Sequence, residues 1–551
     1  MSGLRSNSIA VPIDKAAIWL RSKLPQSRKG STAIVNGGDL SIVPEVTPSD
    51  VLRYRYHHGV NLGSIFVLER WLTPSMFPPK AAARQTSELE AARLWIQSIG
   101  LPAARARFEA HWAAALSDAD LDWLVGTAHV TSIRLPIGFF TLGPAFCAGT
   151  DFAEVSGVYE HAWSYVRNIV QKAHSRGIGV LIDLHALPGG ANDGEHSGTN
   201  SGKPRLWGHV ANIRAATHAL EFVVNEAKIM PGVLGVQVVN EAAWGAKGMY
   251  TWYDKLLSSF ARIDSSMPIY ISDAWNFEKA IKYAVGKNKF SRELTNPVII
   301  DTHVYWAFSD DDRAKPPQQA INEARTKLKE LEGHQGDVCA LNSAIAVIVG
   351  EYSCVLSEET WSRAGRKTTR EELVRQFGHA QSARYQECCA GSFFWTLKMD
   401  WMPGGEWGFR AQTDSGIINA PSYMKLSSTE VQESVQKAQI SSESAKKASL
   451  EAHVWYWSTK EKKKNLEQWR YSKGWQMGFD DAMAFFGMRA SGNLGNCGGG
   501  GDRIGMMDLW IKKRIIEMGM RGDLWEFEHG FRKGVEDFGK ITGAYLPEES
   551  I

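Results

Sequence analysis

Ala344-Ile-Ala-Val-Ile-Val-Gly-Glu351 is a short apolar run, rich in β-branched residues, that ends abruptly on a carboxylic acid. A run of this kind is typical of a strand that is buried on both faces, as in a parallel sheet covered by helices. Seven similar runs occupy residues 59–66, 132–137, 179–185, 232–240, 268–272, 298–303 and 391–397. Together they make eight, which is the number of strands in a (β/α)₈ barrel.

Stretches with helical periodicity lie between these runs, at residues 155–176, 213–229, 251–263, 317–331 and 369–390. Each is long enough for the crossover helix that two neighbouring parallel strands require. The sequence therefore predicts an α/β fold, a (β/α)₈ TIM barrel over residues 56–424. An N-terminal extension over residues 1–55 precedes it, and a C-terminal α-helical extension over residues 425–551 follows it.

The C-terminal region begins with a polar, helix-prone stretch and contains an internal repeat of residues 469–481 in residues 525–537. Small residues four positions apart, Gly474/Gly478 and Gly530/Gly534, would let two helices approach closely. We expect these helices either to pack against each other or to form a homo-oligomer contact. A helical appendage without function and an oligomerisation or targeting module both remain open. The glycine-rich run 492–501 lacks the GK[ST] ending of a phosphate loop and is interpreted as a flexible linker.

The composition narrows the class of partner. The 62 basic and 60 acidic residues leave a net charge of +2, which argues against nucleic acid. The 21 tryptophans fit a carbohydrate-binding protein, because sugar rings present apolar C–H faces that stack on aromatic rings, although core packing also uses tryptophan.

The sequence also bears on where the protein resides. No apolar stretch approaches the roughly 20 residues of a membrane span. Asp14 and Lys15 interrupt the place where a signal peptide needs its apolar segment, and the six cysteines form no disulfide framework. We therefore expect an intracellular protein, with non-classical export to the cell wall or the extracellular space as the alternative.

Two glutamates stand at the carboxyl ends of predicted strands, where barrel enzymes place their active sites. Glu241 follows Val-Gln-Val-Val-Asn240, and Glu351 ends the run quoted first. A single glutamate in such a place is more often a surface or capping residue. Two that converge can hydrolyse a glycosidic bond, one as proton donor and the other as nucleophile, and a separation near 5 Å would mean retention of configuration.

Other polar or aromatic residues end the neighbouring strands: Arg134, Asp183, His185, Asp301, His303, Tyr305 and Trp395. Arg134 and the two histidines can hydrogen-bond sugar hydroxyls and keep one carboxyl group ionised, and Trp395 can stack on a sugar ring. A metal site built from the histidines and acids is the weaker interpretation, because HExxH or a similar local spacing does not occur. We expect neither a metal nor a cofactor.

The stretch Gly59-Val-Asn-Leu-Gly-Ser-Ile-Phe-Val-Leu-Glu69-Arg-Trp-Leu-Thr-Pro-Ser-Met-Phe77 resembles the opening signature of the fungal exo-β-1,3-glucanases (glucan 1,3-β-glucosidases) of glycoside hydrolase family 5. The resemblance covers roughly residues 55–420. It continues through Arg134-Leu-Pro-Ile-Gly, Asp183-Leu-His185, Asn240-Glu241, His303-Val-Tyr305-Trp-Ala-Phe308-Ser, Gly350-Glu351-Tyr-Ser and Phe-Phe-Trp395-Thr-Leu-Lys.

This resemblance implies a retaining hydrolase that releases glucose from β-1,3-linked glucans by double displacement. Glu241 would be the acid/base and Glu351 the nucleophile. The implied substrate-binding residues are Glu69, Arg134, His185, Asn192, Asn240, His303, Tyr305, Phe308 and Trp395. Among them, Asn240 would contact the sugar 2-hydroxyl, and His303 and Tyr305 would flank the nucleophile.

The loop at residues 188–198 departs from the family pattern, which is Pro-Gly-Ser-Gln-Asn-Gly-Phe-Asp-Asn-Ser-Gly. Gly194 replaces a phenylalanine that would form an aromatic clamp with Phe308, and Glu195 and His196 change the polar contacts. The linkage preference is therefore open, and another β-glucoside, such as a glycolipid, is an alternative substrate. A carbohydrate-binding scaffold without turnover is the alternative from a different class, and the retained glutamate pair argues against it.

Overall fold

The computed structural model describes residues 44–81, 86–291, 295–461, 465–495 and 498–545. All the helices and strands that the structure describes lie in one compact unit, Glu45–Ile551. Most of the predicted N-terminal extension, residues 1–43, lies outside the described residues.

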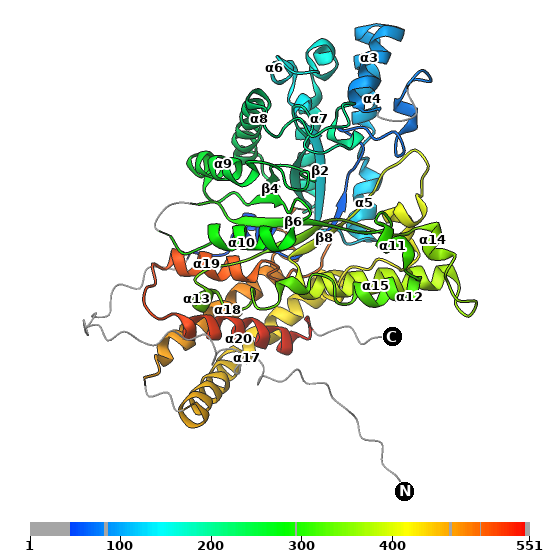
Figure 1. The fold of residues 1–551 in the computed structure, drawn as a ribbon. Helices are drawn as coiled ribbons and strands as arrows, with labels where there is room; N and C mark the ends of the chain where they lie inside the picture. Colours follow the sequence, from blue (N-terminus) through cyan, green and yellow to red (C-terminus); the bar gives the residue numbers. More distant parts are fainter. Residues whose placement is uncertain (1–43, 82–85, 292–294, 462–464, 496–497, 546–551) are drawn as a thin grey trace. The chain divides into compact units, whose positions relative to one another are not determined.

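Eight parallel strands close into a barrel in their sequence order, which confirms the predicted TIM fold (Figure 1). Their bounds are β1 His57–Asn61, β2 Ser132–Gly138, β3 Gly179–Ala186, β4 Val233–Gln237, β5 Ile269–Ser272, β6 Val298–Trp306, β7 Val347–Leu356 and β8 Gly391–Phe394. β1 ends at Asn61, five residues before the predicted end, and the chain meets the sheet again in a single bridge between Phe66 and Ile137 before it reaches Glu69. β7 continues five residues past Glu351, so this glutamate lies within the strand.

Helices follow the strands as the barrel pattern requires (Figure 1). The barrel helices are α2 Pro48–Tyr54, α3 Glu88–Ile99, α4 Leu101–Ala113, α5 Asp118–Gly126, α6 Pro144–Cys147, α7 Ala162–Ser175, α8 Val210–Ile229, α9 Met249–Asp264, α10 Phe277–Lys287, α11 Asp310–Ala314, α12 Pro317–Ala324, α13 Val338–Leu341, α14 Glu358–Trp361, α15 Arg370–Cys388 and α16 Phe409–Asp414. The core lies between strands and helices, and includes Val180, Val236, Ile300 and Val349 from the sheet with Val224 and Phe377 from the helices.

The predicted boundaries differ from the structure mainly where a helix breaks. The predicted helix 155–176 consists of a 3₁₀ segment, Ala153–Tyr159, followed by α7. The predicted helix 317–331 ends as α12 at Ala324. Four residues further on, Leu328 has a φ of 63°, in the left-handed region, so an α-helix could not continue to the predicted end at residue 331.

The C-terminal helices are α17 Ser428–Trp455, α18 Gln468–Gly487, α19 Met507–Glu517 and α20 Trp525–Thr542. The two repeat segments lie in α18 and α20, which pack against each other. A Cβ atom built on Gly474 or Gly478 would lie 2.0 Å from the carbonyl oxygen of Phe527 or Phe531 on α20. The glycines thus bring two helices of one chain into backbone contact, and these faces are not available for a homo-oligomer contact.

This backbone contact predicts a stability effect that can be measured. The variant Gly478→Ala is expected to lower the free energy of unfolding by about 1–3 kcal/mol, since its new methyl group meets a backbone oxygen that cannot move aside. Gly487→Ala, in the same helix, is the matched control because its Cβ would meet only Val435 Cγ2 at 3.5 Å. Thermal and urea unfolding of both variants would check this. Equal or greater stability of Gly478→Ala would contradict the close packing.

The end of the glycine-rich run is packed, so the expectation of a flexible linker is wrong for residues 499–501, which are buried. The amides of Gly500 and Gly501 donate to the carbonyl oxygens of Leu426 and Tyr423 at 2.7 and 2.9 Å. Gly500 has a φ of 83°, and a Cβ there would lie 2.5 Å from the Met424 carbonyl oxygen. Only glycine combines this conformation with so close an approach.

Buried polar contacts join the C-terminal helices to the barrel. The carboxylate of Glu528 on α20 accepts hydrogen bonds from the amides of Val338 and Cys339, both at 2.8 Å. Arg55, next to β1, forms a fully buried ion pair with Asp502 at 3.3 Å.

Across the described residues, no helix combines the length and the apolar character needed to cross a membrane.

Candidate active site

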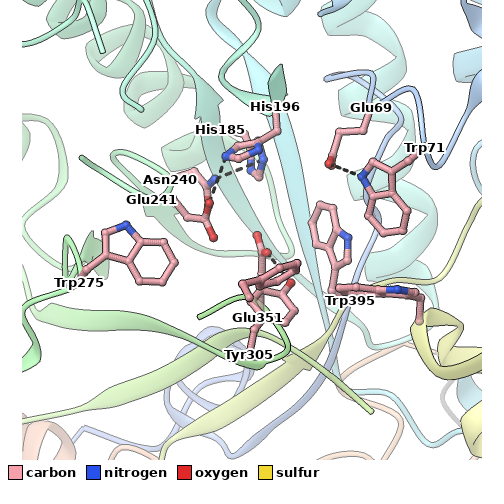
Figure 2. Close-up of a pocket in the computed structure, with 12 residues that line it drawn as sticks. Glu69, Trp71, His185, His196, Asn240, Glu241, Trp275, Tyr305, Glu351 and Trp395 are labelled. Carbon is pink, nitrogen blue, oxygen red and sulfur yellow. Dashed lines mark hydrogen bonds and ion pairs between the residues drawn. The ribbon is translucent and has the colours of Figure 1, made fainter. Parts of the chain in front are cut away.

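A cavity of about 570 Å³ opens at the carboxyl ends of the barrel strands (Figure 2). This is where TIM-barrel enzymes carry their active sites. The cavity is lined by Glu69, Trp71, His185, His196, Asn240, Glu241, Trp275, Tyr305, Phe308, Glu351, Trp395 and Trp407. Eight of the eleven residues predicted for the site line it, while Arg134, Asn192 and His303 do not.

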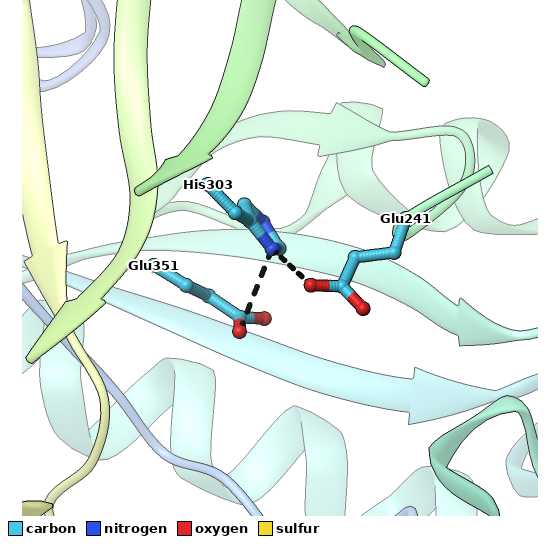
Figure 3. A group of neighbouring side chains, drawn as sticks. All are labelled: Glu241, His303 and Glu351. Atoms are coloured by element: carbon cyan, nitrogen blue, oxygen red, sulfur yellow. Dashed lines mark hydrogen bonds and ion pairs between the residues drawn. The ribbon is translucent and has the colours of Figure 1, made fainter. Parts of the chain in front are cut away.

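Glu241 and Glu351 converge across this cavity (Figure 3). One carboxylate oxygen of each lies, together with a ring nitrogen of His303, within 4.8 Å of the others. A spacing of roughly 5 Å places one carboxylate in reach of the anomeric carbon and the other in reach of the leaving oxygen, as in retaining glycosidases. The wider gap of inverting enzymes, which admits a water molecule, is not seen between these two side chains.

Glu351 is held as an acceptor of hydrogen bonds. Arg134 Nη1 donates to Oε1 at 2.9 Å, and the Tyr305 hydroxyl donates to Oε2 at 2.8 Å. Burial raises the pKa of Tyr305 well above 10, and the charge of Glu351 raises it further. The phenol therefore stays protonated and keeps donating, so that the Glu351 carboxylate is fixed in one orientation.

Arg134 lies beneath the cavity and is completely buried. Its guanidinium donates to Gln237 Oε1 at 2.9 Å, Asn61 Oδ1 at 2.9 Å and Asn240 Oδ1 at 2.7 Å. It also pairs with Asp183 at 3.0 Å. Burial opposes its charge, but the nearby carboxylates outweigh this and raise its pKa. The prediction that Arg134 binds sugar directly is corrected, because its donors are already engaged by the residues that surround it.

His185 and Asn240 extend the hydrogen-bond network around Arg134. His185 Nδ1 donates to Asp183 Oδ2 at 2.7 Å, so its Nε2 is free to accept from Asn240 Nδ2 at 3.3 Å. The His185 ring also stacks on Trp395, with ring centres 6.0 Å apart and planes at 12°. The amide, the imidazole and the indole are therefore held in fixed orientations on one wall of the cavity.

Two histidines face the two oxygens of Glu241. His303 Nδ1 lies 2.8 Å from Oε1, and His196 Nε2 lies 3.1 Å from Oε2. Burial alone would raise the pKa of Glu241, but its contacts with the two histidines outweigh burial and hold the pKa well below 4.5. His303 Nε2 contacts Asp301 at 3.1 Å, so both of its ring nitrogens face carboxylates and the ring is an imidazolium.

The backbone at Glu241 is also unusual, since its φ of 42° lies in the left-handed region that few side chains adopt. Asn192 supports this turn: its Nδ2 donates to the Glu241 carbonyl oxygen at 3.1 Å, and its Oδ1 accepts from the Gly194 amide. The structure thus places Asn192 behind the acid rather than at the sugar, and we reinterpret it as a positioning residue.

Glu241, His303 and Glu351 also have a spacing that a metal ion could use. Their contacts explain the cluster in another way, because protons on both nitrogens of His303 match the carboxylates of Glu241 and Asp301. The positive ring lies between three acidic groups and balances part of their charge. Hydrogen bonds therefore account for the arrangement of all three side chains.

Aromatic side chains make up much of the remaining wall. Trp71 donates its Nε1 hydrogen to Glu69 Oε2 at 2.9 Å and packs on Trp407 at 5.1 Å. Phe308 and Trp275 are 59% and 51% exposed, so their rings are free to contact a ligand at the cavity mouth. Trp71, Trp275, Trp407 and the role of His196 were not predicted from the sequence. Trp71 lies close to Glu69 in the sequence, and Trp275 lies close to the end of β5, so both could have been predicted. No motif near Trp407 marks it as a site residue.

Several known proteins are similar to this chain in sequence. The family model described as "Glucan 1,3-beta-glucosidase 3 C-terminal domain" matches residues 438–542. Glucan 1,3-beta-glucosidase 3 of Schizosaccharomyces pombe is 29% identical, over 87% of this chain and 94% of its own. An uncharacterized glycosyl hydrolase of Saccharomyces cerevisiae is 29% identical, over 89% and 92%. A probable glucan 1,3-beta-glucosidase A of Aspergillus niger is 24% identical, over 63% and 83%.

Among solved structures, the rutinosidase from Aspergillus niger superposes with a TM-score of 0.50 and 17% sequence identity. The match covers 67% of this chain and 99% of the rutinosidase. At this identity the likeness supports the barrel fold alone.

Proposed function

Because the chain is an exo-1,3-glucanase-like protein of glycoside hydrolase family 5, we propose that it hydrolyses β-glucosidic bonds with retention and releases glucose from β-1,3-linked glucans. The observation that carries the proposal is the approach of Glu241 and Glu351, whose carboxylate oxygens come within 4.8 Å.

The reaction would proceed by double displacement. Glu351, fixed by Arg134 and Tyr305, attacks the anomeric carbon while Glu241 supplies a proton to the departing oxygen. In the second step Glu241 removes a proton from water, which attacks the glycosyl-enzyme and releases β-glucose. Arg134 and His303 place positive charge beside the Glu351 carboxylate, at 2.9 and 3.5 Å.

The glucose ring would lie between the polar wall and Trp395. The Trp395 indole offers a stacking face, and its orientation is set by the His185 ring. Asn240 is bound to both Arg134 and His185, so its amide is held firmly beside the reacting carbon. Glu69, oriented by Trp71, adds a carboxylate that can accept hydrogen bonds from sugar hydroxyls.

The proposal is tested by incubating the purified protein with laminarin, laminaribiose and 4-nitrophenyl β-glucoside. Proton NMR of the first product should show β-glucose before mutarotation begins, because two inversions at the anomeric carbon give net retention. Release of α-glucose first would contradict the mechanism. Binding of laminarin without any turnover would favour the scaffold alternative.

A second substrate class, β-glucosides with an apolar aglycone such as glycolipids, is favoured by the cavity mouth. Gly194 removes half of the aromatic clamp expected for a second sugar, while Trp275 and Phe308 expose large apolar faces. The same assay with octyl β-glucoside and glucosylceramide discriminates between the classes. A higher kcat/KM on these than on laminaribiose would assign the protein to the second class.

A further inference from the structure

Gly194 and His196, two departures in the loop after β3, are coupled in space. His196 lies in the 3₁₀ turn Glu195–Ser197, and a Cβ atom on Gly194 would lie 2.3 Å from its Cε1. Gly194 has a φ of −73°, a value that any residue adopts. The glycine therefore matters for space and not for conformation, since a side chain at this position would displace the imidazole of His196.

The imidazole that fills this space reaches Glu241. His196 Nε2 lies 3.1 Å from Oε2, an ion-pair contact without the alignment of a regular hydrogen bond. Since His303 occupies the other oxygen at 2.8 Å, both oxygens face a ring nitrogen. A carboxylate in this position is ionised in the resting site, yet a general acid must deliver a proton. A neighbouring group has to hold that proton.

We propose that His196 holds the proton that Glu241 donates, so that the two side chains act as one acid/base unit. In the first step the His196 Nε2–H bond breaks and a Glu241 Oε2–H bond forms. That proton passes to the glycosidic oxygen as the bond to the anomeric carbon breaks. In the second step the proton removed from water returns through Glu241 to His196. The inference deepens the proposed function and rests on it.

His196 suits this role better than His303. The His303 ring is bound to Asp301 at 3.1 Å and also lies 3.5 Å from Glu351 Oε2, so its loss of a proton would leave buried carboxylates unpaired. Its side chain is only 4% exposed, whereas that of His196 is 27% exposed. The exposed part of the His196 ring does not include Nε2, which is buried against Glu241, so the proton returns to this nitrogen through Glu241.

The charged groups facing His196 come from four parts of the barrel. They are Glu241 after β4, Glu69 after β1 and Glu351 on β7, with the His185 ring 5.7 Å away at the end of β3. Burial lowers the pKa of His196, but the three carboxylates outweigh burial and raise it to about 9. The unit thus keeps its proton at neutral pH, and loses it as the pH rises through that value.

The test is the pH dependence of kcat/KM for His196→Asn, which restores the family's residue and cannot carry the proton. Laminaribiose has a leaving group that needs protonation, and we expect its basic limb to move to lower pH by about one unit or more. At about pH 8 the loss should exceed about tenfold. On 2,4-dinitrophenyl β-glucoside, whose leaving group needs no proton, the loss should stay below about threefold. Gly194→Ala, which displaces the ring without removing it, should shift the limb in the same direction.

Glu195→Gln is the matched control, since Glu195 shares the turn with His196 but is not among the residues that line the cavity. It should keep the wild-type profile. A wild-type basic limb in His196→Asn, or a loss by the same factor at every pH and on both substrates, would overturn the relay. Failure of the wild-type protein to hydrolyse any β-glucoside would instead overturn the proposed function.

Discussion

Glu351→Ala is expected to lower kcat/KM on 4-nitrophenyl β-glucoside by about 10⁴-fold or more, because the variant lacks the carboxylate that attacks the anomeric carbon in the proposed reaction. Removal of the side chain also opens a small space beside Arg134 and Tyr305, where a small anion fits. Azide added to this variant should restore turnover and form α-glucosyl azide, since a single displacement inverts the anomeric configuration.

The controls for this prediction separate chemistry from folding. Glu358→Gln replaces an exposed glutamate shortly after β7 that pairs with Arg370 at 2.9 Å, and should retain full activity. The thermal midpoint of Glu351→Ala should remain near that of the wild type. Formation of β-glucosyl azide, or more than about one per cent residual activity in a folded protein, would exclude Glu351 as nucleophile.

Glu241→Ala is expected to show an effect that depends on the leaving group. On laminaribiose, kcat/KM should fall by about 10²- to 10⁴-fold, because the departing alkoxide is no longer protonated. On 2,4-dinitrophenyl β-glucoside the first step needs no acid, so the glycosyl-enzyme should form readily and then accumulate. A burst of dinitrophenol followed by slow turnover is the expected time course.

Azide also identifies the role of Glu241. It should attack the accumulated glycosyl-enzyme of Glu241→Ala on the face where water normally enters, and the product should be β-glucosyl azide. The opposite anomers from the two variants would distinguish acid/base from nucleophile without reference to any other protein. An equal loss on both substrates, or formation of the α-anomer, would contradict the assignment of Glu241.

The two glutamates differ in their surroundings more than in their positions. Glu351 accepts from Arg134 and Tyr305, whereas Glu241 faces two histidines, whose raised pKa values keep a proton beside it at neutral pH. A fixed anion suits a nucleophile, and a carboxylate with exchangeable protons suits an acid/base. The assignment of roles that the family resemblance implies is therefore supported by the contacts of each side chain.

The strands and the catalytic pair could be predicted from the sequence because their signals are local. The run 344–350 is apolar, as a strand buried on both faces must be, and Glu351, the acid that follows the end of this run, lies within β7. Parallel strands that close into a barrel bring all such ends to one rim. Glu241 and Glu351 therefore had to converge once eight strands were recognised.

The contacts of the other site residues were decided by the tertiary structure, because they depend on which groups meet across the barrel. Its place at a strand end predicts that Arg134 binds sugar, but its donors are occupied by Gln237, Asn61, Asn240 and Asp183. The composition of the glycine-rich run predicts flexibility, but residues 423–426 pack against its end.

The sequence by itself determined the barrel, the helical repeat and the two acids, since each follows from periodicity or from position at a strand end. Only the tertiary structure decided that the repeat helices pack within one chain, that Trp407 reaches the cavity, and that His196 faces the acid. Those contacts join residues far apart in the chain, or depend on the space that a missing side chain leaves, as at Gly194. No local pattern in the sequence records such a space.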